Sequence, residues 1–259
     1  HITPGMDKEI SKEFMKILQK QGIKFHMQTK VDSIKKNKNG AVVSTTNKEG
    51  KKVNFECDVV LISVGRKSYI KNLNLEAVGV ALDQKKRIKT DKNFLTNVKN
   101  IYAIGDVIKG PMLAHKAEEE GIAVAENIAG QSGHVNYDVI PGVIYTSPEV
   151  AAIGKTEEQL NELNIKYKIG KFPFMANSRA KTIDQSEGFV KILSDQTTDK
   201  VLGAHIIGNH AGEMIAEIAI AMEFGASSED IARTCHAHPT FSEALKEAAL
   251  SVDKRAIHS

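Results

Sequence analysis

The chain has 259 residues, of which 41% are hydrophobic and 26% are charged, as in an ordinary globular protein. Its formal net charge of +3 is too small to indicate nucleic-acid binding, and its lysines are not gathered into a basic arm. No window approaches the run of about 18 apolar residues that a membrane span requires. We therefore expect neither nucleic acid nor a membrane as a partner.

The first predicted element is a helix that starts close to the beginning of the chain. Its apolar residues share one stripe: Ile10, Phe14, Ile17 and Leu18. Asp7 is a suitable N-cap for this helix, and Gly22 is a suitable C-terminal stop. Residues 1–5 lack an initiating Met, so we expect the chain to be a piece of a longer protein.

Strands are predicted after this helix. Residues 23–27 alternate between apolar and polar, and a three-stranded meander follows, with turns at Asn39-Gly40 and Glu49-Gly50. Residues 58–65 are almost continuously apolar, which is typical of a buried parallel strand. Residues 1–65 therefore fit the second half of a Rossmann-type nucleotide-binding domain that lacks its glycine-rich first half.

The next part, residues 66–135, is irregular up to about residue 100. A short buried strand then ends at Gly105-Asp106, and a helix is predicted over residues 115–129. The inward face of that helix is made of small residues, namely Ala117, Gly121 and Ala125.

Residues 136–259 are predicted to form a separate α+β module. Its strands are expected at 143–146, 149–154, 166–174, 188–194 and 201–208, and its helices at 156–163, 211–224, 228–233 and 241–249. Strands joined by turns favour an antiparallel sheet with helices on one side. The fold class expected for the whole chain is thus α/β and α+β.

Two cysteines, Cys57 and Cys235, lie far apart in the sequence. Their small number indicates a reducing compartment, either a bacterial cytoplasm or a mitochondrial matrix. They do not form a closely spaced redox pair, and we expect both to be small buried hydrophobic residues.

Asp106 is the first candidate for a functional residue. A carboxylate at the end of a strand, followed by a loop and a helix N-terminus, is a common ligand-binding geometry in α/β proteins. The carboxylate can accept a hydrogen bond from a sugar-like hydroxyl, while the helix amides face an electron-rich group. The alternative is that Asp106 only caps a turn, and the residues alone do not decide between the two.

The second candidate is the segment 235–243, in which His238 precedes a proline and Glu243 follows five residues later. An imidazole oriented by a carboxylate is the usual arrangement of a general base. Two alternatives remain open. Thr240 and Glu243 match a helix capping box, and His236 with His238 could be two metal ligands, although no third ligand is evident.

Both segments resemble motifs of the pyridine nucleotide–disulfide oxidoreductase family. Residues 96–106 are similar to its second flavin-binding motif, which implies that Asp106 binds the ribityl chain of FAD. The resemblance also implies that Met112, Leu113, Ala114 and His115 lie against the flavin ring. The helix that begins there would stabilise negative charge on the reduced ring by about 1 kcal/mol or more.

The His-Pro-Thr-x-Ser-Glu segment resembles the active-site base motif of the same family. This implies that His238 accepts a proton and that Glu243 orients its ring. In the family this pair reaches across the interface of a homodimer to the disulfide of the other subunit.

Residues 59–66 resemble the strand that closes the NAD domain of the family. The resemblance implies that Gly65 lies near the nicotinamide and that the backbone of Val31 lies near the adenine of NAD. The sequence departs from the usual family pattern after Arg66, where Lys67-Ser68-Tyr69 follows.

The resemblance extends over the whole chain and implies three parts. Residues 1–65 would be half of an NAD domain, residues 66–135 a central FAD-contacting domain, and residues 136–259 an interface domain that dimerises. Residues 145–151, 236–238 and 253–258 are similar to stretches of the branch that oxidises dihydrolipoamide. This branch implies FAD and NAD as cofactors, and the lipoyl domain and core of a 2-oxo acid dehydrogenase complex as partners.

In the family, the redox disulfide and both glycine-rich nucleotide motifs lie upstream of the segments found here. We therefore expect the chain alone to be inactive and to hold FAD weakly or not at all. Two other interpretations remain: a non-catalytic dimerisation module, and a related flavin disulfide reductase with another substrate.

Overall fold

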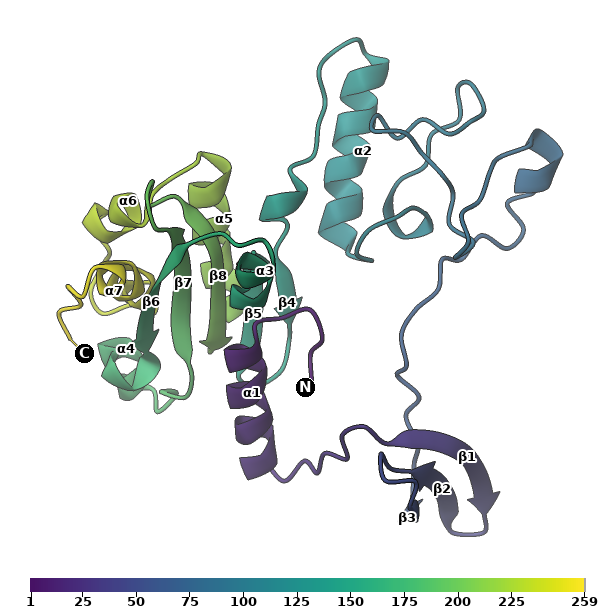
Figure 1. Ribbon diagram of the computed structural model, residues 1–259, viewed down its shortest axis with the longest axis horizontal. Helices are drawn as coiled ribbons and strands as arrows, with labels where there is room; N and C mark the ends of the chain where they lie inside the picture. Colours follow the sequence, from purple (N-terminus) through teal and green to yellow (C-terminus); the bar gives the residue numbers. More distant parts are fainter. Residues whose placement is uncertain (259) are drawn as a thin grey trace. The chain divides into compact units, whose positions relative to one another are not determined.

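The computed structural model describes residues 1–258, which form two compact units. The large unit contains residues 1–57 together with the chain from Asp138 onward, and the small unit contains Asp58–Tyr137. Figure 1 shows the elements of both units. Among the described residues, no helix combines the length and the apolar character that crossing a membrane requires.

The large unit is built on a five-stranded antiparallel sheet with the order β4-β5-β8-β7-β6. The strands are β4 (Gly142–Ile144), β5 (Glu149–Gly154), β6 (Tyr167–Pro173), β7 (Phe189–Asp195) and β8 (Val201–Gly208). All five were expected from the sequence pattern, and the predicted antiparallel sheet is confirmed.

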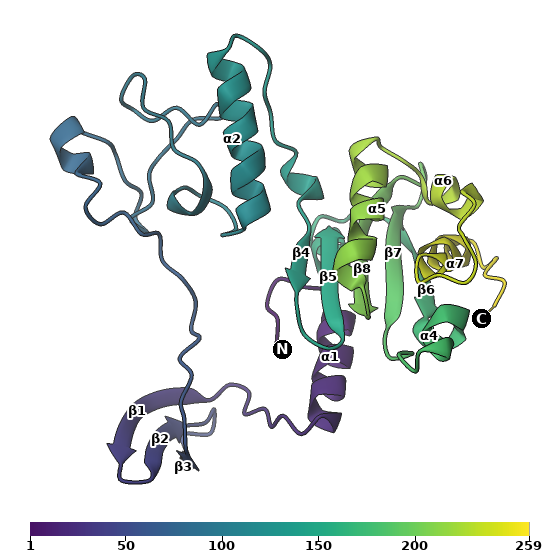
Figure 2. The ribbon, with the colours of Figure 1, turned by 180° about the vertical axis from the view of Figure 1, so that it is seen from behind.

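Helices cover both faces of this sheet, as Figures 1 and 2 show. One face packs against α5 (Ala211–Glu223), α6 (Ser228–Arg233) and α7 (Glu243–Val252) through alternate strand residues such as Val190 and Ile206. The intervening residues Phe189 and Ile207 pack against α1 on the other face. The expectation of helices on one side only was therefore wrong. The remaining helices of this unit are α3 (Glu157–Glu162) and α4 (Ser178–Thr182), and α4 was not predicted.

Helix α1 (Lys8–Lys20) confirms the first predicted element. The carboxylate of Asp7 accepts a hydrogen bond from the Glu9 amide at 3.0 Å, so Asp7 is its N-cap. The predicted stripe of Ile10, Phe14, Ile17 and Leu18 is buried against the sheet. Burial of this stripe holds the helix on the sheet.

A buried lysine lies beside the start of α1. The Lys191 ammonium, with no exposed surface, is 3.1 Å from an oxygen of Asp7 and 3.1 Å from an oxygen of Glu9, and it also contacts Glu157. Burial alone would lower the pKa of Lys191, but the hydrogen bond to Glu157 and the charge of Asp7 outweigh it and raise that pKa. The ion cluster therefore joins α1 and α3 to strand β7.

The predicted meander is present as an antiparallel sheet of β1 (Lys30–Asn37), β2 (Gly40–Thr46) and β3 (Lys52–Cys57). The predicted strands at 23–27 and 58–65 were wrong, because neither segment forms a ladder. The side chains of Val59, Leu61, Ile62 and Val64 are between 69% and 90% exposed. No strand among the described residues pairs with this apolar run, so its backbone remains extended but irregular.

The small unit packs its irregular segments around helix α2 (Ala114–Ile128), which confirms the predicted helix. The strand expected to end at Asp106 is reduced to one bridge between Tyr102 and Leu95, followed by a 3-10 turn at Gly105–Val107. The buried residues of α2 are Lys116, Glu120 and Ala123, so its inward face is not made only of small residues as predicted. The functional division at 1–65, 66–135 and 136–259 stays a prediction, since the compact units follow a different grouping.

Gly170 in β6 allows the close approach of α7, which carries Glu243. A Cβ atom at this position would lie 1.9 Å from the Ala248 carbonyl oxygen and 2.7 Å from the Val252 side chain. Gly170→Ala should therefore lower the free energy of unfolding by about 1–3 kcal/mol, as measured by urea denaturation.

Gly142 in β4 provides the matched control, because a Cβ atom there meets nothing within 4 Å. Gly142→Ala should change the free energy of unfolding by less than about 0.5 kcal/mol. Equal stability of the two variants would contradict the proposed tightness of the β6–α7 contact.

Candidate active site

His238 and Glu243 form a hydrogen-bonded pair at the start of α7. His238 Nδ1 lies 2.9 Å from Glu243 Oε1, and the side chain of His238 is 64% exposed. Because the carboxylate accepts at Nδ1, the neutral ring carries its proton there and presents the lone pair of Nε2. No hydrogen bond to Nε2 occurs among the described residues, so this atom is open to a proton from outside.

Glu243 also contacts the backbone through its second oxygen. Glu243 Oε2 accepts a hydrogen bond from the Thr240 amide at 2.8 Å. The predicted capping box is only half formed, because the Thr240 hydroxyl donates to the Ala237 carbonyl and caps no helix amide. The orienting role and the backbone-binding role of Glu243 thus coexist on different oxygens.

These contacts keep the Glu243 carboxylate ionised. Partial burial alone would raise its pKa, but hydrogen bonds from the Thr240 amide and from His238 outweigh burial and lower the pKa. An ionised carboxylate beside Nδ1 stabilises the positive charge that the ring acquires when Nε2 takes a proton. The geometry is that of a positioned base.

His236 does not share a ligand site with His238. Its Nε2 atom is 2.6 Å from Glu217 Oε1 on α5, and its Nδ1 atom is 2.9 Å from the Thr234 carbonyl oxygen. The hydrogen bond to Glu217 raises the pKa of His236 against the opposing effect of burial. With both ring nitrogens engaged, the geometry gives no support to the two-histidine metal site left open by the sequence.

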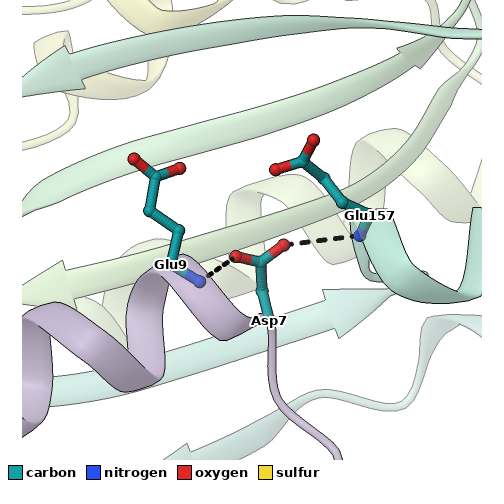
Figure 3. Close-up of side chains that lie close together, drawn as sticks. All are labelled: Asp7, Glu9 and Glu157. Atoms are coloured by element: carbon teal, nitrogen blue, oxygen red, sulfur yellow. Dashed lines mark hydrogen bonds between the residues drawn. The ribbon is translucent and has the colours of Figure 1, made fainter.

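Three carboxylates elsewhere have metal-like spacing. Oxygens of Asp7, Glu9 and Glu157 lie within 4.8 Å of one another, and Figure 3 shows these side chains gathered at the start of α1. The Lys191 ammonium, however, contacts all three of them. This cluster is therefore satisfied by a lysine, and its acidic residues need no metal ion.

Both cysteines are free thiols, and neither is fully buried. Cys57 at the end of β3 is partly buried, whereas Cys235 is exposed in the segment before His238. The expectation that both are buried was wrong. Cys235 follows α6 in a loop, where its Sγ lies 4.0 Å from the His236 carbonyl oxygen.

A second group of residues surrounds Asp106 in the small unit. The Asp106 carboxylate, with a 49% exposed side chain, accepts no backbone amide among the described residues, which disfavours the turn-capping alternative. Its nearest cation is Arg66, whose Nη1 is 4.0 Å away. Arg66 also donates to the Met112 carbonyl, and Ser68 donates to the Asp106 carbonyl at 2.6 Å. Arg66 was named in the sequence only as the point after which the family pattern ends, and its link between these two segments was not predicted.

Helix α2 begins directly after Met112 and Leu113, with Ala114 and His115 in its first turn. Its N-cap residue, Leu113, provides no side-chain acceptor for the first helix amides. An uncapped helix N-terminus favours an electron-rich group. The small unit therefore brings together a half-exposed carboxylate, an arginine and a helix N-terminus, and these groups suit a polar ligand with hydroxyl and electron-rich parts such as FAD.

The two residues predicted to contact NAD, Val31 and Gly65, belong to different compact units. Val31 is half exposed in β1 of the large unit, where it pairs with Thr45. Gly65 belongs to the small unit and has a φ of +108°. Their roles stay predictions.

Comparisons with known proteins agree with these features. The family model for pyridine nucleotide-disulphide oxidoreductases matches residues 1–121, and the model for their dimerisation domain matches residues 140–249. The chain belongs to the pyridine nucleotide-disulphide oxidoreductase family.

Within this family, the sequence is homologous to dihydrolipoyl dehydrogenases. It is 54% identical to the mitochondrial enzyme of Pisum sativum over 258 residues, which are 99% of this chain and 52% of that protein. It is 56% identical to the human mitochondrial enzyme over 249 residues, covering 95% of this chain and 49% of the relative. Leghemoglobin reductase of Glycine max is 54% identical over 251 residues, or 96% of this chain and 48% of that protein. The chain spans about half the length of the curated relatives it matches.

Solved structures show the same fold. LpdA from Mycobacterium tuberculosis matches with a TM-score of 0.87 and 24% identity, over 96% of this chain and 54% of that one. The HOCl-induced flavoprotein disulfide reductase RclA from Escherichia coli matches with a TM-score of 0.85 and 26% identity, over 95% and 56% of the two chains.

The lowered pKa of Glu243 gives a pH-dependent prediction. Glu243→Gln should reduce the free energy of unfolding by about 1 kcal/mol near neutral pH, because the charge-assisted hydrogen bonds weaken. Since the folded pKa lies below the ordinary 4.5, the stabilisation is complete above pH 4.5 and is lost as the pH falls through the folded value. Urea denaturation of both proteins as a function of pH measures this difference.

Glu162→Gln, at an exposed position at the end of α3, is the control and should have little effect at any pH. A cost of Glu243→Gln that stays constant from neutral to acid pH would argue against ionic stabilisation by Glu243.

Proposed function

We propose that this chain is part of a dihydrolipoyl dehydrogenase, which reoxidises dihydrolipoamide with NAD through FAD and a redox disulfide. The observation that carries the proposal is the His238–Glu243 pair with its open Nε2 atom. Its support is the identity of 54% to 56% with such enzymes over nearly the whole chain.

In the proposed reaction, His238 acts on the substrate thiol. Nε2 takes the thiol proton, and the electron pair of the broken S–H bond stays on sulfur as a thiolate. Glu243 holds the ring in the required tautomer and stabilises the imidazolium. The thiolate is the form that attacks a disulfide, and its formation is the step that this chain contributes.

The small unit supplies contacts for FAD in this proposal. Asp106 would accept a hydrogen bond from a ribityl hydroxyl of bound FAD, and the segment from Met112 to His115 would contact its ring. The positive end of α2 would favour negative charge on that ring. When bound, FAD supplies the electron transfer between the disulfide and NAD.

Several further properties belong to the same proposal. Gly65 and Val31 lie near NAD, and residues 1–65, 66–135 and 136–259 act as part of an NAD domain, a central domain and an interface domain. The protein works as a homodimer with a lipoyl domain at the core of a 2-oxo acid dehydrogenase complex. The mitochondrial relatives favour the mitochondrial matrix over a bacterial cytoplasm.

The base role is tested in the full-length protein by His238→Gln. We expect the turnover of dihydrolipoamide to fall by about 10²- to 10⁴-fold, because no side chain replaces the proton acceptor. Flavin absorbance should remain unchanged, since His238 is not among the residues that this proposal assigns to FAD.

His258 provides a matched control, because its Nδ1 atom is 2.7 Å from Glu247 and its side chain is 59% exposed. His258→Gln should retain nearly normal turnover. An undiminished rate in the His238→Gln enzyme would refute the assignment of the base.

The isolated chain should neither oxidise dihydrolipoamide nor retain FAD, because in the family the redox disulfide and the glycine-rich motifs lie outside the segments found here. The measurement is visible absorbance after desalting of chain that has been incubated with FAD. A flavin spectrum that survives desalting would contradict this expectation.

A second candidate function is a dimerisation module without catalysis, which the match to the family's dimerisation domain favours. Analytical ultracentrifugation of the isolated chain should show a discrete dimer in this case. A monomer at micromolar concentration would count against it.

The third possibility is a related reductase with another substrate. Comparing the turnover of lipoamide and of glutathione by the full-length protein tests it.

A further inference from the structure

A fully buried ion pair lies behind the Asp106 segment. Lys116 and Glu120 of α2 both have 0% exposed side chains, and Lys116 Nζ is 2.8 Å from Glu120 Oε1. Removing two charges from water is costly, and apolar residues of similar volume often stabilise a core as well or better. Stability alone does not explain this buried ion pair, so the groups that it contacts indicate its role.

The pair binds the backbone of Gly105 from both sides. Glu120 Oε2 accepts the Gly105 amide at 2.6 Å, and Lys116 Nζ donates to the Gly105 carbonyl at 3.3 Å. The amide belongs to the peptide plane before Gly105 and the carbonyl to the plane after it. Both planes are thus fixed to α2, and the next residue along the chain is Asp106.

Tyr137 completes this cluster from the end of the small unit. Its hydroxyl donates to Glu120 Oε1 at 2.6 Å, so Glu120 accepts from three donors. Burial, together with the hydrogen bond to Glu120 and its negative charge, raises the pKa of Tyr137. The hydroxyl therefore stays protonated and remains a donor at neutral pH.

Close packing restricts the same loop. Gly105 has a φ of +70°, and a Cβ atom there would lie 2.9 Å from Ala117 Cβ. A Cβ atom at Gly110 would lie 3.0 Å from Lys116 Cε. The loop from Gly105 to Gly110 thus contacts the first turns of α2 directly. At Gly105 and Gly110 it lies so close to the helix that a larger side chain would not fit without a shift.

We propose that Lys116, Glu120 and Tyr137 are positioning residues for FAD. They fix the Gly105 backbone so that the Asp106 carboxylate and the N-terminus of α2 keep the spacing required by the ribityl chain and the ring. The inference rests on the proposed function of Asp106 and α2 as FAD contacts. It extends that function to three residues that touch no cofactor themselves.

The test uses the full-length protein with Lys116→Met, Glu120→Gln, the double variant and Tyr137→Phe. Each apoprotein is titrated with FAD, and the dissociation constant is measured from flavin fluorescence. The midpoint potential of the bound flavin is measured as a second readout. A glutamine has one acceptor oxygen and cannot accept hydrogen bonds from all three donors that contact Glu120. Glu120→Gln should therefore weaken FAD binding at least about tenfold.

The double variant separates positioning from unpaired buried charge. Each single change leaves one buried charge alone, whereas Lys116→Met with Glu120→Gln leaves none, so the double variant should recover thermal stability. FAD affinity should stay at least about tenfold below wild type, because the Gly105 carbonyl still lacks its donor. Tyr137→Phe, at a half-exposed residue, should fold normally and show a smaller loss of FAD affinity together with a shifted potential.

Lys191→Met is the matched control, because the Lys191 side chain is equally buried and also pairs with carboxylates, but it lies in the large unit. It should lower the melting temperature while leaving FAD affinity and potential unchanged. Wild-type FAD affinity and potential in a folded double variant would overturn the proposal. An equal loss of FAD affinity in Lys191→Met would overturn it as well, since the effect would then be general destabilisation.

Failure of the proposed function gives a different result. If wild-type protein binds no FAD, or if Asp106→Asn leaves its affinity unchanged, the flavin assignment itself is wrong. If Asp106→Asn weakens binding while the three positioning variants do not, only the present inference is wrong.

Discussion

A buried ammonium group requires carboxylates around it, and this requirement organises both compact units. In the large unit Lys191 holds Asp7, Glu9 and Glu157, which come from two helices and the start of the chain. In the small unit Lys116 is paired with Glu120 over the Gly105 backbone. An apolar contact tolerates sliding, whereas a hydrogen-bonded ion pair in a protein interior holds one geometry. The elements that carry the candidate site are thus fixed by charge as well as by packing.

The candidate active-site pair, His238 and Glu243, is held by fewer contacts than these buried ion pairs. His238 is largely exposed, and its orientation depends on one carboxylate whose second oxygen is bound to a backbone amide. Helix α7 places that carboxylate, and α7 lies on the sheet through tightly packed small residues. A rigid support beneath a solvent-facing imidazole suits the proposed role of His238 as a base that takes a proton from an incoming thiol. Such preorganisation of the support is what general-base catalysis requires.

Much of the large unit could be predicted from sequence because its signals are local. The short, largely apolar runs of β5 and β8 and the stripe on α1 each indicate an element without knowledge of its neighbours. The pairing of His238 with Glu243 was likewise accessible, since the two residues are five positions apart. The role of Glu243 on both oxygens follows from the same short segment.

The misses share a different cause, which is dependence on residues distant in sequence. Residues 58–65 have the composition of a strand. A strand, however, forms only when another strand pairs with it, and the pattern of one segment does not predict whether that second strand exists. The inner face of α2 was read from its small residues, although Lys116 and Glu120 stand at i and i+4 beside them. A charged pair at that spacing, adjacent to Ala117 and Gly121, was the available signal. Its meaning depends on the Gly105 backbone, which only the folded chain brings close.

The unpaired run from Val59 to Val64 has a practical consequence for anyone preparing this chain. In the part of the chain that the structure describes, its backbone amides and carbonyls form no ladder, and five of its six side chains are apolar. Extended segments of this kind template intermolecular β-structure, which makes them sites of aggregation. Val64→Lys would place a charge within this run, and it should reduce aggregation at high protein concentration without altering either folded core.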